Sequence, residues 1–305
     1  MSQIYKPFLK WAGGKRQLVK EIEILRIKTH GTNFNDYYEP FVGGGANLFF
    51  LQPKKSIYIN DINAELVCLY NSLKNDIVLL QKELQIHELH DSENYYYEIR
   101  KWDRETNFEE KYSKIQRAGR FLYLNKRCYN GLYRVNSKNQ FNVPYGKYAK
   151  KLHFDLSSLE LISEYFNKHN ICISSNDYAQ AVSSAKKGDL VYFDPPYFPL
   201  NSKYSFDMYT SSGFGANIIE KKKEQIRLKK VADELSGRGC FVIISNSDTE
   251  FIKELYSNEN TDAKGQEKYF IYQTVRVTRM INSKVGARGV EHNSELIIIN
   301  NVAGK

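Results

Sequence analysis

Acidic residues are missing from one long segment of the chain. Between Lys111 and Phe154 there is no Asp or Glu, whereas the same segment contains eleven Lys and Arg residues. Its excess of positive charge is larger than the formal charge of +9 carried by all 305 residues. A solvated basic face is one interpretation. The length of the segment, and the Tyr, Phe and Asn residues between its basic ones, favour a surface that binds a polyanion.

Cysteines are few, and long apolar runs are absent. The four cysteines form no CxxC pair, which argues against a disulfide framework or a zinc site. No apolar run approaches the ~18 residues of a membrane span. The first residues, MSQIYKPFLKW, lack the apolar stretch of a signal peptide. We therefore expect a cytoplasmic globular protein that binds no metal and no membrane.

A strand, a glycine turn and a helix are predicted early in the chain. Residues 36–39 are typical of a strand, Gly43 to Gly45 of a tight turn, and Ala46 begins a helix. This is the opening unit of a dinucleotide-type fold, in which the helix amino end favours a carboxylate or phosphate. The next predicted strand ends at Asp61, where Rossmann-like sites hold ribose hydroxyls. Asp61 or Asn63 could instead be a helix N-cap, but turn and acid together favour a ribose-containing cofactor.

Upstream of this unit, a Trp-Ala-Gly-Gly turn places Lys15 near the amino end of another helix. Leu18, Ile22 and Leu25 share one face of that helix. The Gly-Gly-Lys sequence resembles half of a phosphate-binding P-loop, but the glycine that should precede it is missing. A nucleotide-phosphate loop is therefore not expected here.

Residues 64–125 are predicted to be mostly helical, with a polar interruption at about 91–110. This insert breaks the alternation of strands and helices and indicates a separate lobe. Residues 128–148 then contain Asn-Gly, Ser-Lys-Asn and Pro-Tyr-Gly turn sequences, which predict a hairpin with aromatic and basic side chains at its tip. The fold class is thus α/β and Rossmann-like, with a mostly parallel sheet and an inserted helical plus β-hairpin lobe.

The remaining segments return to alternation. A helix over 159–167, a strand ending at Asp177 and Tyr178, and a long helix from residue 218 are expected. The Lys-Lys-Lys run of that long helix is predicted to be a solvated face. Residues 198–217 form a predicted loop, and the last two strands are predicted to enclose a polar loop at 282–293.

The sequence Gly188 to Tyr197, GDLVYFDPPY, joins a buried-strand pattern to two prolines that end the strand. Asp194, the Pro195 carbonyl and the Tyr197 ring are thereby held at the carboxyl end of a strand, where open α/β sheets bind ligands. A planar substrate with an NH₂ group suits this arrangement, because two oxygens accept its N–H bonds and the ring stacks on it. An ordinary strand-to-loop stop is the alternative.

Two cofactors suit the glycine turn and Asp61: a nicotinamide dinucleotide and S-adenosylmethionine. The methionine carboxylate of the latter matches Lys15 and the turn. Neither cofactor explains Asp-Pro-Pro-Tyr, whereas an exocyclic amine such as that of adenine does. In a duplex this amine is paired, so the base must be flipped out.

The chain resembles the Dam-type DNA adenine-N6 methyltransferases, and among them the GATC-modifying enzymes of the DpnM kind. The resemblance rests on FLKWAGGK (8–15), YEPFVGGGA (38–46), INDIN (59–63), YNGLYRVNSKNQFNVPYGKY (129–148), VYFDPPY (191–197) and ISNS (244–247). These six motifs occur in the order of the family and cover nearly the whole chain. The resemblance implies a class I methyltransferase fold, with a catalytic domain over 1–65 and 160–305 and a target-recognition domain over 66–159.

The resemblance also implies roles for individual residues. The catalytic set is Asp194, Pro195, Pro196 and Tyr197. The set that contacts S-adenosylmethionine is Trp11, Lys15, Glu39, Phe41, Gly43, Asp61, Asp177, Tyr178 and Asp194. The DNA-binding set is Lys10, Tyr129, Asn130, Leu132, Arg134, Asn136, Lys138 and Pro144. Arg134 is the expected guanine contact, because arginine pairs with guanine O6 and N7.

The sequence therefore predicts an enzyme that methylates adenine N6 in double-stranded DNA, within GATC, as the modification component beside a restriction endonuclease acting on the same site. The alternatives are an RNA adenine or protein glutamine methyltransferase, or a DNA-binding relative that has lost catalysis. The basic segment argues against a protein substrate, and the intact Asp194 and Tyr197 argue against an inactive relative.

Overall fold

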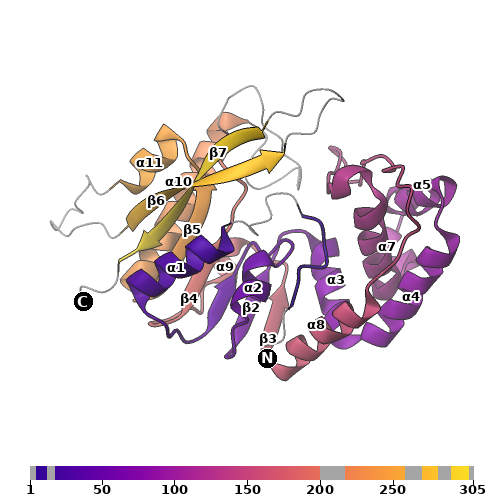
Figure 1. Cartoon of the computed structure of the whole chain (residues 1–305), viewed down its shortest axis with the longest axis horizontal. Coiled ribbons are helices and arrows are strands. Elements are labelled where there is room, and N and C mark those ends of the chain that lie inside the picture. Colours follow the sequence, from indigo (N-terminus) through magenta and orange to yellow (C-terminus); the bar gives the residue numbers. More distant parts are fainter. Residues whose placement is uncertain (1–4, 12–17, 200–216, 258–269, 281–289, 302–305) are drawn as a thin grey trace. The chain divides into compact units, whose positions relative to one another are not determined.

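The computed structural model describes residues 5–11, 18–199, 217–257, 270–280 and 290–301. In these ranges seven strands form one sheet in the order β3-β2-β1-β4-β5-β7-β6 (Figure 1). The pairs β2–β3, β1–β4 and β4–β5 are parallel, and the last two strands pair antiparallel. The strands are β1 Tyr37–Glu39, β2 Ile57–Asn60, β3 Ile171–Ser174, β4 Leu190–Phe193, β5 Phe241–Ser247, β6 Phe270–Met280 and β7 Val290–Asn300. A mostly parallel sheet flanked by helices confirms the predicted Rossmann-like class.

The chain divides into two compact units. The first comprises Met1–Gly14, Phe41–Ala181 and Phe206–Gly213, and the second Lys15–Pro40, Val182–Ser205 and Phe214–Lys305. The functional boundaries predicted from the sequence stay a prediction, because a division by compactness assigns no function.

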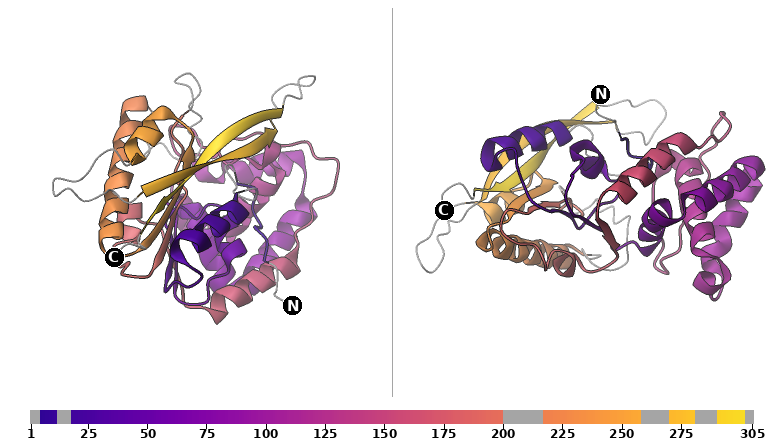
Figure 2. Two further views of the ribbon diagram at one scale, coloured as in Figure 1. Left: turned by 60° about the vertical axis from the view of Figure 1, so that its left-hand side comes forward. Right: turned by 90° about the horizontal axis from the view of Figure 1, so that it is seen from below.

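The second unit contains five of the strands and the helices α1 Val19–His30, α10 Ile218–Gly237 and α11 Glu250–Tyr256. Helices α1 and α10 cover opposite faces of these strands (Figure 2). Strand β4 is buried at all four residues, as its unbroken apolar sequence predicts for a central parallel strand. Strands β6 and β7 lie side by side over eleven residue pairs. Strand β7 begins at Val290, so residues 290–293 of the predicted polar loop belong to a strand, and the rest of that prediction lies outside the described residues.

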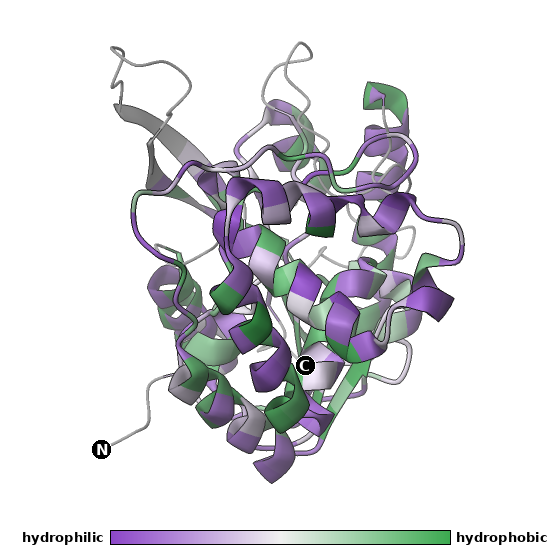
Figure 3. Ribbon diagram, turned by 90° about the vertical axis from the view of Figure 1, so that its right-hand side faces the viewer, coloured by the Kyte–Doolittle hydropathy of each residue, from purple (hydrophilic) through white to green (hydrophobic). Residues whose placement is uncertain are grey.

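The first unit contains β2 and β3 with the helices α2 Ala46–Leu51, α3 Ala64–Asn75, α8 Leu156–Lys168 and α9 Tyr178–Ala181. Its inserted part consists of α4 Ile77–His90, α5 Glu93–Lys101, the short η1 Trp102–Arg104, α6 Phe108–Lys111, α7 Lys114–Arg127 and η2 Tyr129–Gly131. Helix α7 packs against α3, α4 and α5. Hydrophobic and hydrophilic residues alternate along these helices (Figure 3), which is the pattern of helices that share a core.

Two helical predictions need correction. The polar stretch at about 91–110 is not an interruption, because it contains α5, whose N-cap Ser92 accepts a hydrogen bond from the Tyr95 amide at 3.1 Å. The Lys-Lys-Lys run of α10 is not wholly solvated either. Lys221 is buried whereas Lys222 and Lys223 are exposed, since three consecutive residues of a helix span most of its circumference.

The predicted hairpin is present as a paired loop rather than as two strands. Two antiparallel bridges join Cys128 to Tyr145 and Val135 to Phe141. Between them, the carbonyl of Val143 accepts hydrogen bonds from Tyr96 Oη at 2.9 Å and Arg100 Nη1 at 3.1 Å. Backbone groups that helix side chains satisfy in this way are not available for a continuous strand ladder.

Candidate active site

The glycine turn of the first unit forms a backbone surface that side chains cannot occupy. Gly43 and Gly45 have φ of +47° and +70°, a region that favours glycine. A Cβ at Gly43 would lie 2.7 Å from the Trp11 indole, and one at Gly45 would lie 2.7 Å from the Phe49 ring. The Tyr70 hydroxyl holds the turn in place, because it donates to the Gly43 carbonyl at 2.9 Å.

Asp61 closes this turn. Its Oδ2 accepts the amide of Gly43 at 3.0 Å and its Oδ1 accepts the amide of Asn63 at 3.0 Å. The cap of helix α3 is Asn63, whose side chain accepts the Leu66 amide at 3.2 Å. The structure thus assigns the helix cap to Asn63, and the ribose contact of Asp61 stays a prediction. Burial raises the pKa of the Asp61 carboxyl to about 6, although the amides of Asn63 and Gly43 act to lower it.

Phe41 and Tyr178 lie beside the same turn within the first unit. Their ring centroids are 5.2 Å apart. Tyr178 is buried and follows the exposed Asp177, whose carboxylate accepts the Ala179 amide at 3.0 Å. The backbone just before Asp177 and Tyr178 is held by the buried Asn60. Its side chain accepts the Asn176 amide at 2.7 Å and donates to the Asn176 carbonyl at 3.0 Å. Asn60 was not singled out in the sequence, although it lies in the INDIN motif.

The first unit therefore contains six residues of the predicted cofactor set: Trp11, Phe41, Gly43, Asp61, Asp177 and Tyr178. Glu39 and Asp194 belong to the second unit, and Lys15 lies outside the described residues. Glu39 is buried and accepts the Tyr37 hydroxyl at 2.8 Å.

In the second unit, β4 ends directly at the Asp-Pro-Pro-Tyr turn. Asp194 and Tyr197 are half-buried, Pro195 is buried and Pro196 is exposed. The Tyr197 hydroxyl donates to Glu295 Oε2 at 2.8 Å. Burial raises the pKa of Tyr197 well above its ordinary value, and the Asp194 and Glu295 carboxylates raise it further. Tyr197 is therefore a neutral ring that keeps its proton, and the sequence offered no sign of its partner Glu295.

The paired loop over 128–148 presents most of the predicted DNA-binding set to solvent. Tyr129, Asn130, Arg134, Lys138 and Pro144 are exposed, whereas Leu132 and Asn136 are half-buried. Asn136 holds the tip of the loop, because its Oδ1 accepts the amides of Lys138 and Gln140 at 3.0 Å each. These contacts favour a supporting role for Asn136 over a base contact.

Lys10 is brought to this loop from a distant part of the sequence. The buried side chain of Asn125 accepts the Lys10 amide at 3.0 Å and donates to the Lys10 carbonyl at 2.7 Å. The Lys10 ammonium is 5.0 Å from the centre of the Tyr148 ring and exposed. The structure therefore places Lys10 beside the paired loop, and its contact with DNA stays a prediction.

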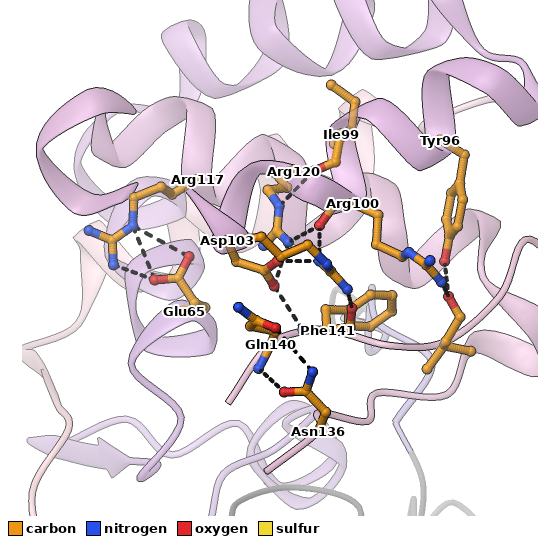
Figure 4. A network of polar contacts seen from close by, with 12 residues as sticks. Glu65, Tyr96, Ile99, Arg100, Asp103, Arg117, Arg120, Asn136, Gln140 and Phe141 are labelled. Atoms are coloured by element: carbon orange, nitrogen blue, oxygen red, sulfur yellow. Dashed lines mark hydrogen bonds and ion pairs between the residues drawn. The ribbon is translucent and has the colours of Figure 1, made fainter. Parts of the chain in front are cut away.

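The basic segment is not one uniform surface. Arg117, Arg120 and Arg127 are buried and pair with acids from outside the segment. Arg117 pairs with Glu65 and Arg120 with Asp103 (Figure 4), and Arg127 Nε lies 2.8 Å from Asp91 Oδ1. The acid-free sequence overstates the charge available to a polyanion, since it hides these partners. The exposed charges of the loop and of the residues after it are Arg134, Lys138, Lys147, Lys150 and Lys151.

Neither a metal site nor a membrane span is found where the chain is described. No three His, Cys, Asp or Glu side chains of these ranges are grouped so that they could hold a metal ion. No helix in the same ranges has the length and apolar character needed to cross a bilayer.

Comparison with known proteins identifies the family. A model of the D12 class N6 adenine-specific DNA methyltransferases matches residues 11–270. The type II methyltransferase M1.LlaDCHI of Lactococcus lactis subsp. cremoris is 40% identical over 295 residues, covering 97% of this chain and 95% of that relative. M.MjaIII, a type II methyltransferase of Methanocaldococcus jannaschii, is 38% identical over 309 residues, covering 97% and 99%. The DNA adenine methylase of Escherichia coli K12 is 35% identical over 291 residues, covering 93% and 91%.

These matches extend over both units and include the glycine turn, the paired loop and the Asp-Pro-Pro-Tyr turn. The chain therefore belongs to the D12 class N6 adenine-specific DNA methyltransferase family and is an adenine-specific DNA methyltransferase.

Proposed function

We propose that the protein transfers a methyl group from S-adenosylmethionine to adenine N6 in double-stranded DNA, within GATC. The observation that carries the proposal is the Asp-Pro-Pro-Tyr turn, which follows the buried strand β4 directly and contains a carboxylate, a carbonyl and an aromatic ring within four residues. We infer that these three groups contact one planar amine. The family supports the adenine and the DNA. The donor, the site and the residue roles are our inference.

The residues of the first unit fit the proposed donor. The Gly43–Gly45 turn exposes backbone that a Cβ would fill, and Asp61 is a suitable acceptor for ribose hydroxyls. The Phe41 and Tyr178 rings suit an adenine ring. Trp11 also belongs to the first unit, whereas Glu39 belongs to the second; Lys15, which lies outside the described residues, is proposed for the methionine carboxylate. When bound, S-adenosylmethionine supplies an electrophilic methyl group on its sulfonium.

Asp194 and Pro195 act on the other partner, the adenine amine. Its lone pair is delocalised into the ring, so the free amine is a weak nucleophile. The Asp194 carboxylate and the Pro195 carbonyl each accept one N–H, which draws the nitrogen toward a tetrahedral arrangement and directs its lone pair to the methyl group. Positioning and fixed dipoles supply this effect. The methylated nitrogen is cationic and strongly acidic, so its proton passes to the Asp194 carboxylate that already accepts the N–H, and no strong base is required.

The base reaches the turn by leaving the duplex. Tyr197 replaces the stacking that the adenine loses, a contact of about 1–3 kcal/mol. The paired loop holds the DNA meanwhile. Tyr129, Leu132 and Pro144 are suited to insertion between bases, whereas Lys138 is suited to a phosphate.

The pKa of Asp61 gives a prediction about cofactor affinity. Ribose hydroxyls donate to an ionised carboxylate, and Asp61 becomes protonated as the pH falls through about 6. We expect the dissociation constant of S-adenosylmethionine to rise roughly tenfold per pH unit below that value. Calorimetric titration between pH 5 and pH 8 measures it. Asp61→Asn, which does not titrate, should bind weakly at every pH; a wild-type constant that does not change with pH contradicts the proposed role.

Arg134 gives a prediction about specificity. Asn142 Oδ1 accepts its Nε at 2.7 Å, which orients the guanidinium and leaves its two Nη groups directed away from that contact. We expect Arg134→Ala to lose about 1–3 kcal/mol of discrimination at one G·C pair. Competition gel shifts with GATC and singly altered duplexes measure it. Lys138→Ala is the matched control and should weaken all duplexes alike. If Arg134→Ala lost the same affinity for GATC and for the altered duplexes, Arg134 would contact a phosphate instead of a base.

The proposed reaction is tested by incubating DNA with the protein and labelled S-adenosylmethionine, then cutting with GATC endonucleases that differ in methylation sensitivity. Incorporated label together with altered cutting supports donor and site. Label without altered cutting rejects GATC, and the absence of label rejects the donor. We further propose a modification role beside an endonuclease of the same specificity, in the cytoplasm; two relatives are named type II methyltransferases.

A further inference from the structure

Tyr197 is fixed by buried polar contacts on both sides of its own position in the chain. The carbonyl of Pro196, just before it, accepts Nε2 of Gln225 at 3.1 Å. The amide of Phe198, just after it, donates to Oδ1 of Asn246 at 3.2 Å. Gln225 belongs to α10 and Asn246 to β5, so a helix and a strand of the second unit both contact the turn.

The two amide side chains also bind each other. Asn246 Nδ2 donates to Gln225 Oε1 at 2.9 Å, and both residues are at most 1% exposed. Ser247 adds a third contact, because its Oγ donates to the Phe198 carbonyl at 2.5 Å. Buried amides are costly unless their hydrogen bonds are satisfied. Two apolar side chains could fill the same buried space without needing hydrogen-bond partners. The presence of Gln225 and Asn246 therefore indicates that their hydrogen bonds to the turn are needed.

We propose that Gln225 and Asn246 are positioning residues for methyl transfer, and that they act by fixing the Asp-Pro-Pro-Tyr turn. The inference rests on the proposed function of that turn. Gln225 engages the carbonyl of Pro196, and no residue in the described ranges donates to the carbonyl of Pro195. The pair thereby determines which of the two proline carbonyls faces the target amine, and it fixes the backbone on both sides of Tyr197.

The first test replaces Gln225 by Met, which keeps the length of the side chain and removes its hydrogen bonds. A small displacement of a reacting group costs up to about 10²-fold in rate. We expect the single-turnover rate of methyl transfer to fall about 10–100-fold, while the dissociation constants for DNA and S-adenosylmethionine change less than about threefold. Lys230→Gln, an exposed change on the same helix, is the control and should transfer at the wild-type rate.

A second variant, Gln225→Glu, keeps the proposal testable if Gln225→Met fails to fold. It has the same shape and keeps an oxygen for Asn246, but it presents an ionised oxygen to the Pro196 carbonyl at high pH. When protonated, its carboxyl O–H donates there instead. We expect the ratio of variant to wild-type rate, measured at each pH, to rise toward one as the pH falls. A ratio that does not depend on pH overturns the positioning role.

Hydrogen exchange at the Phe198 amide, measured without DNA or cofactor, distinguishes a failure of the positioning role from a failure of the proposed methyl transfer. Faster exchange together with slower transfer in Gln225→Met supports the positioning role. Faster exchange with wild-type transfer overturns it, and so does slow transfer with unchanged exchange. Wild-type protein that protects this amide but transfers no methyl group to GATC duplexes refutes the proposed function and leaves the contact itself established.

Discussion

Asp194→Ala is expected to lower the rate of methyl transfer by about 10²–10³-fold, the range measured when one preorganised hydrogen-bonding group is removed from an active site. Asp194 ends the buried strand β4 and is half-buried beside Pro195. Its carboxylate is one of only two proposed acceptors for the target amine. Without it one N–H remains in the plane of the base, and the nitrogen lone pair stays delocalised.

The measurement is a single-turnover assay with labelled S-adenosylmethionine, combined with a gel shift. DNA binding should be nearly unchanged in Asp194→Ala, because the exposed residues of the paired loop belong to the other unit. Asp194→Asn keeps one acceptor oxygen and should lie between the wild type and Asp194→Ala. Transfer by Asp194→Ala at the wild-type rate contradicts the assignment. A parallel loss of DNA binding would show that the substitution disrupts more than the amine contact.

Asp91→Ala is expected to have the largest effect on stability. Asp91 is the carboxylate partner of Arg127, and both side chains are less than a tenth exposed. Arg127 also donates to the Lys150 carbonyl at 3.1 Å, and its own carbonyl accepts the Gly146 amide at 2.8 Å. Removal of one partner leaves a buried charge without compensation, which costs about 3–5 kcal/mol. The end of the paired loop should loosen as well.

Urea unfolding followed by circular dichroism measures this loss. The matched control is Glu105→Ala, which breaks an ion pair with Lys111 at the surface and should leave the unfolding midpoint almost unchanged, as surface pairs do. A second control, Lys147→Gln, removes an exposed charge of the same segment and should weaken DNA binding without affecting stability. A midpoint for Asp91→Ala that equals that of Glu105→Ala contradicts a structural role for the buried arginines.

The buried arginines show why a local excess of charge is an incomplete guide to a surface. Their partners Glu65, Asp91 and Asp103 all precede Lys111, so a count confined to Lys111–Phe154 cannot include them. Only the packing of α7 against α3 and its neighbours brings these acids to the arginines. The prediction of a basic surface holds for the exposed lysines and Arg134, and it was wrong for the three buried arginines of α7.

Predictions based on local sequence signals succeeded where the structural element is formed by the same consecutive residues that carry the signal. The unbroken apolar run before Asp194 predicted β4, and the glycines after Glu39 predicted the turn. Asp61 and Asn63 remained ambiguous, since both residue types cap helices. The ambiguity ends only when the Leu66 amide is seen to donate to the side chain of Asn63.

Gln225 and Glu295 could not be found from the sequence at all. Gln225 lies in a helix with many lysines, and Glu295 lies at the start of an apolar strand segment. Each is a polar residue whose purpose depends on a partner tens of residues away, Pro196 for Gln225 and Tyr197 for Glu295. Hydrogen bonds between elements distant in the chain have no periodic signature, unlike an amphipathic helix or a buried strand.

The most direct test of the account is to map methylated bases by sequencing DNA that was exposed to the protein and S-adenosylmethionine. We expect N6-methyladenine at the adenine of GATC on both strands, and its absence from DNA treated with Asp194→Ala. Methylation of adenine in another sequence, or in a pattern independent of sequence, would contradict the proposed specificity. The absence of N6-methyladenine with the wild-type protein would contradict the proposed reaction.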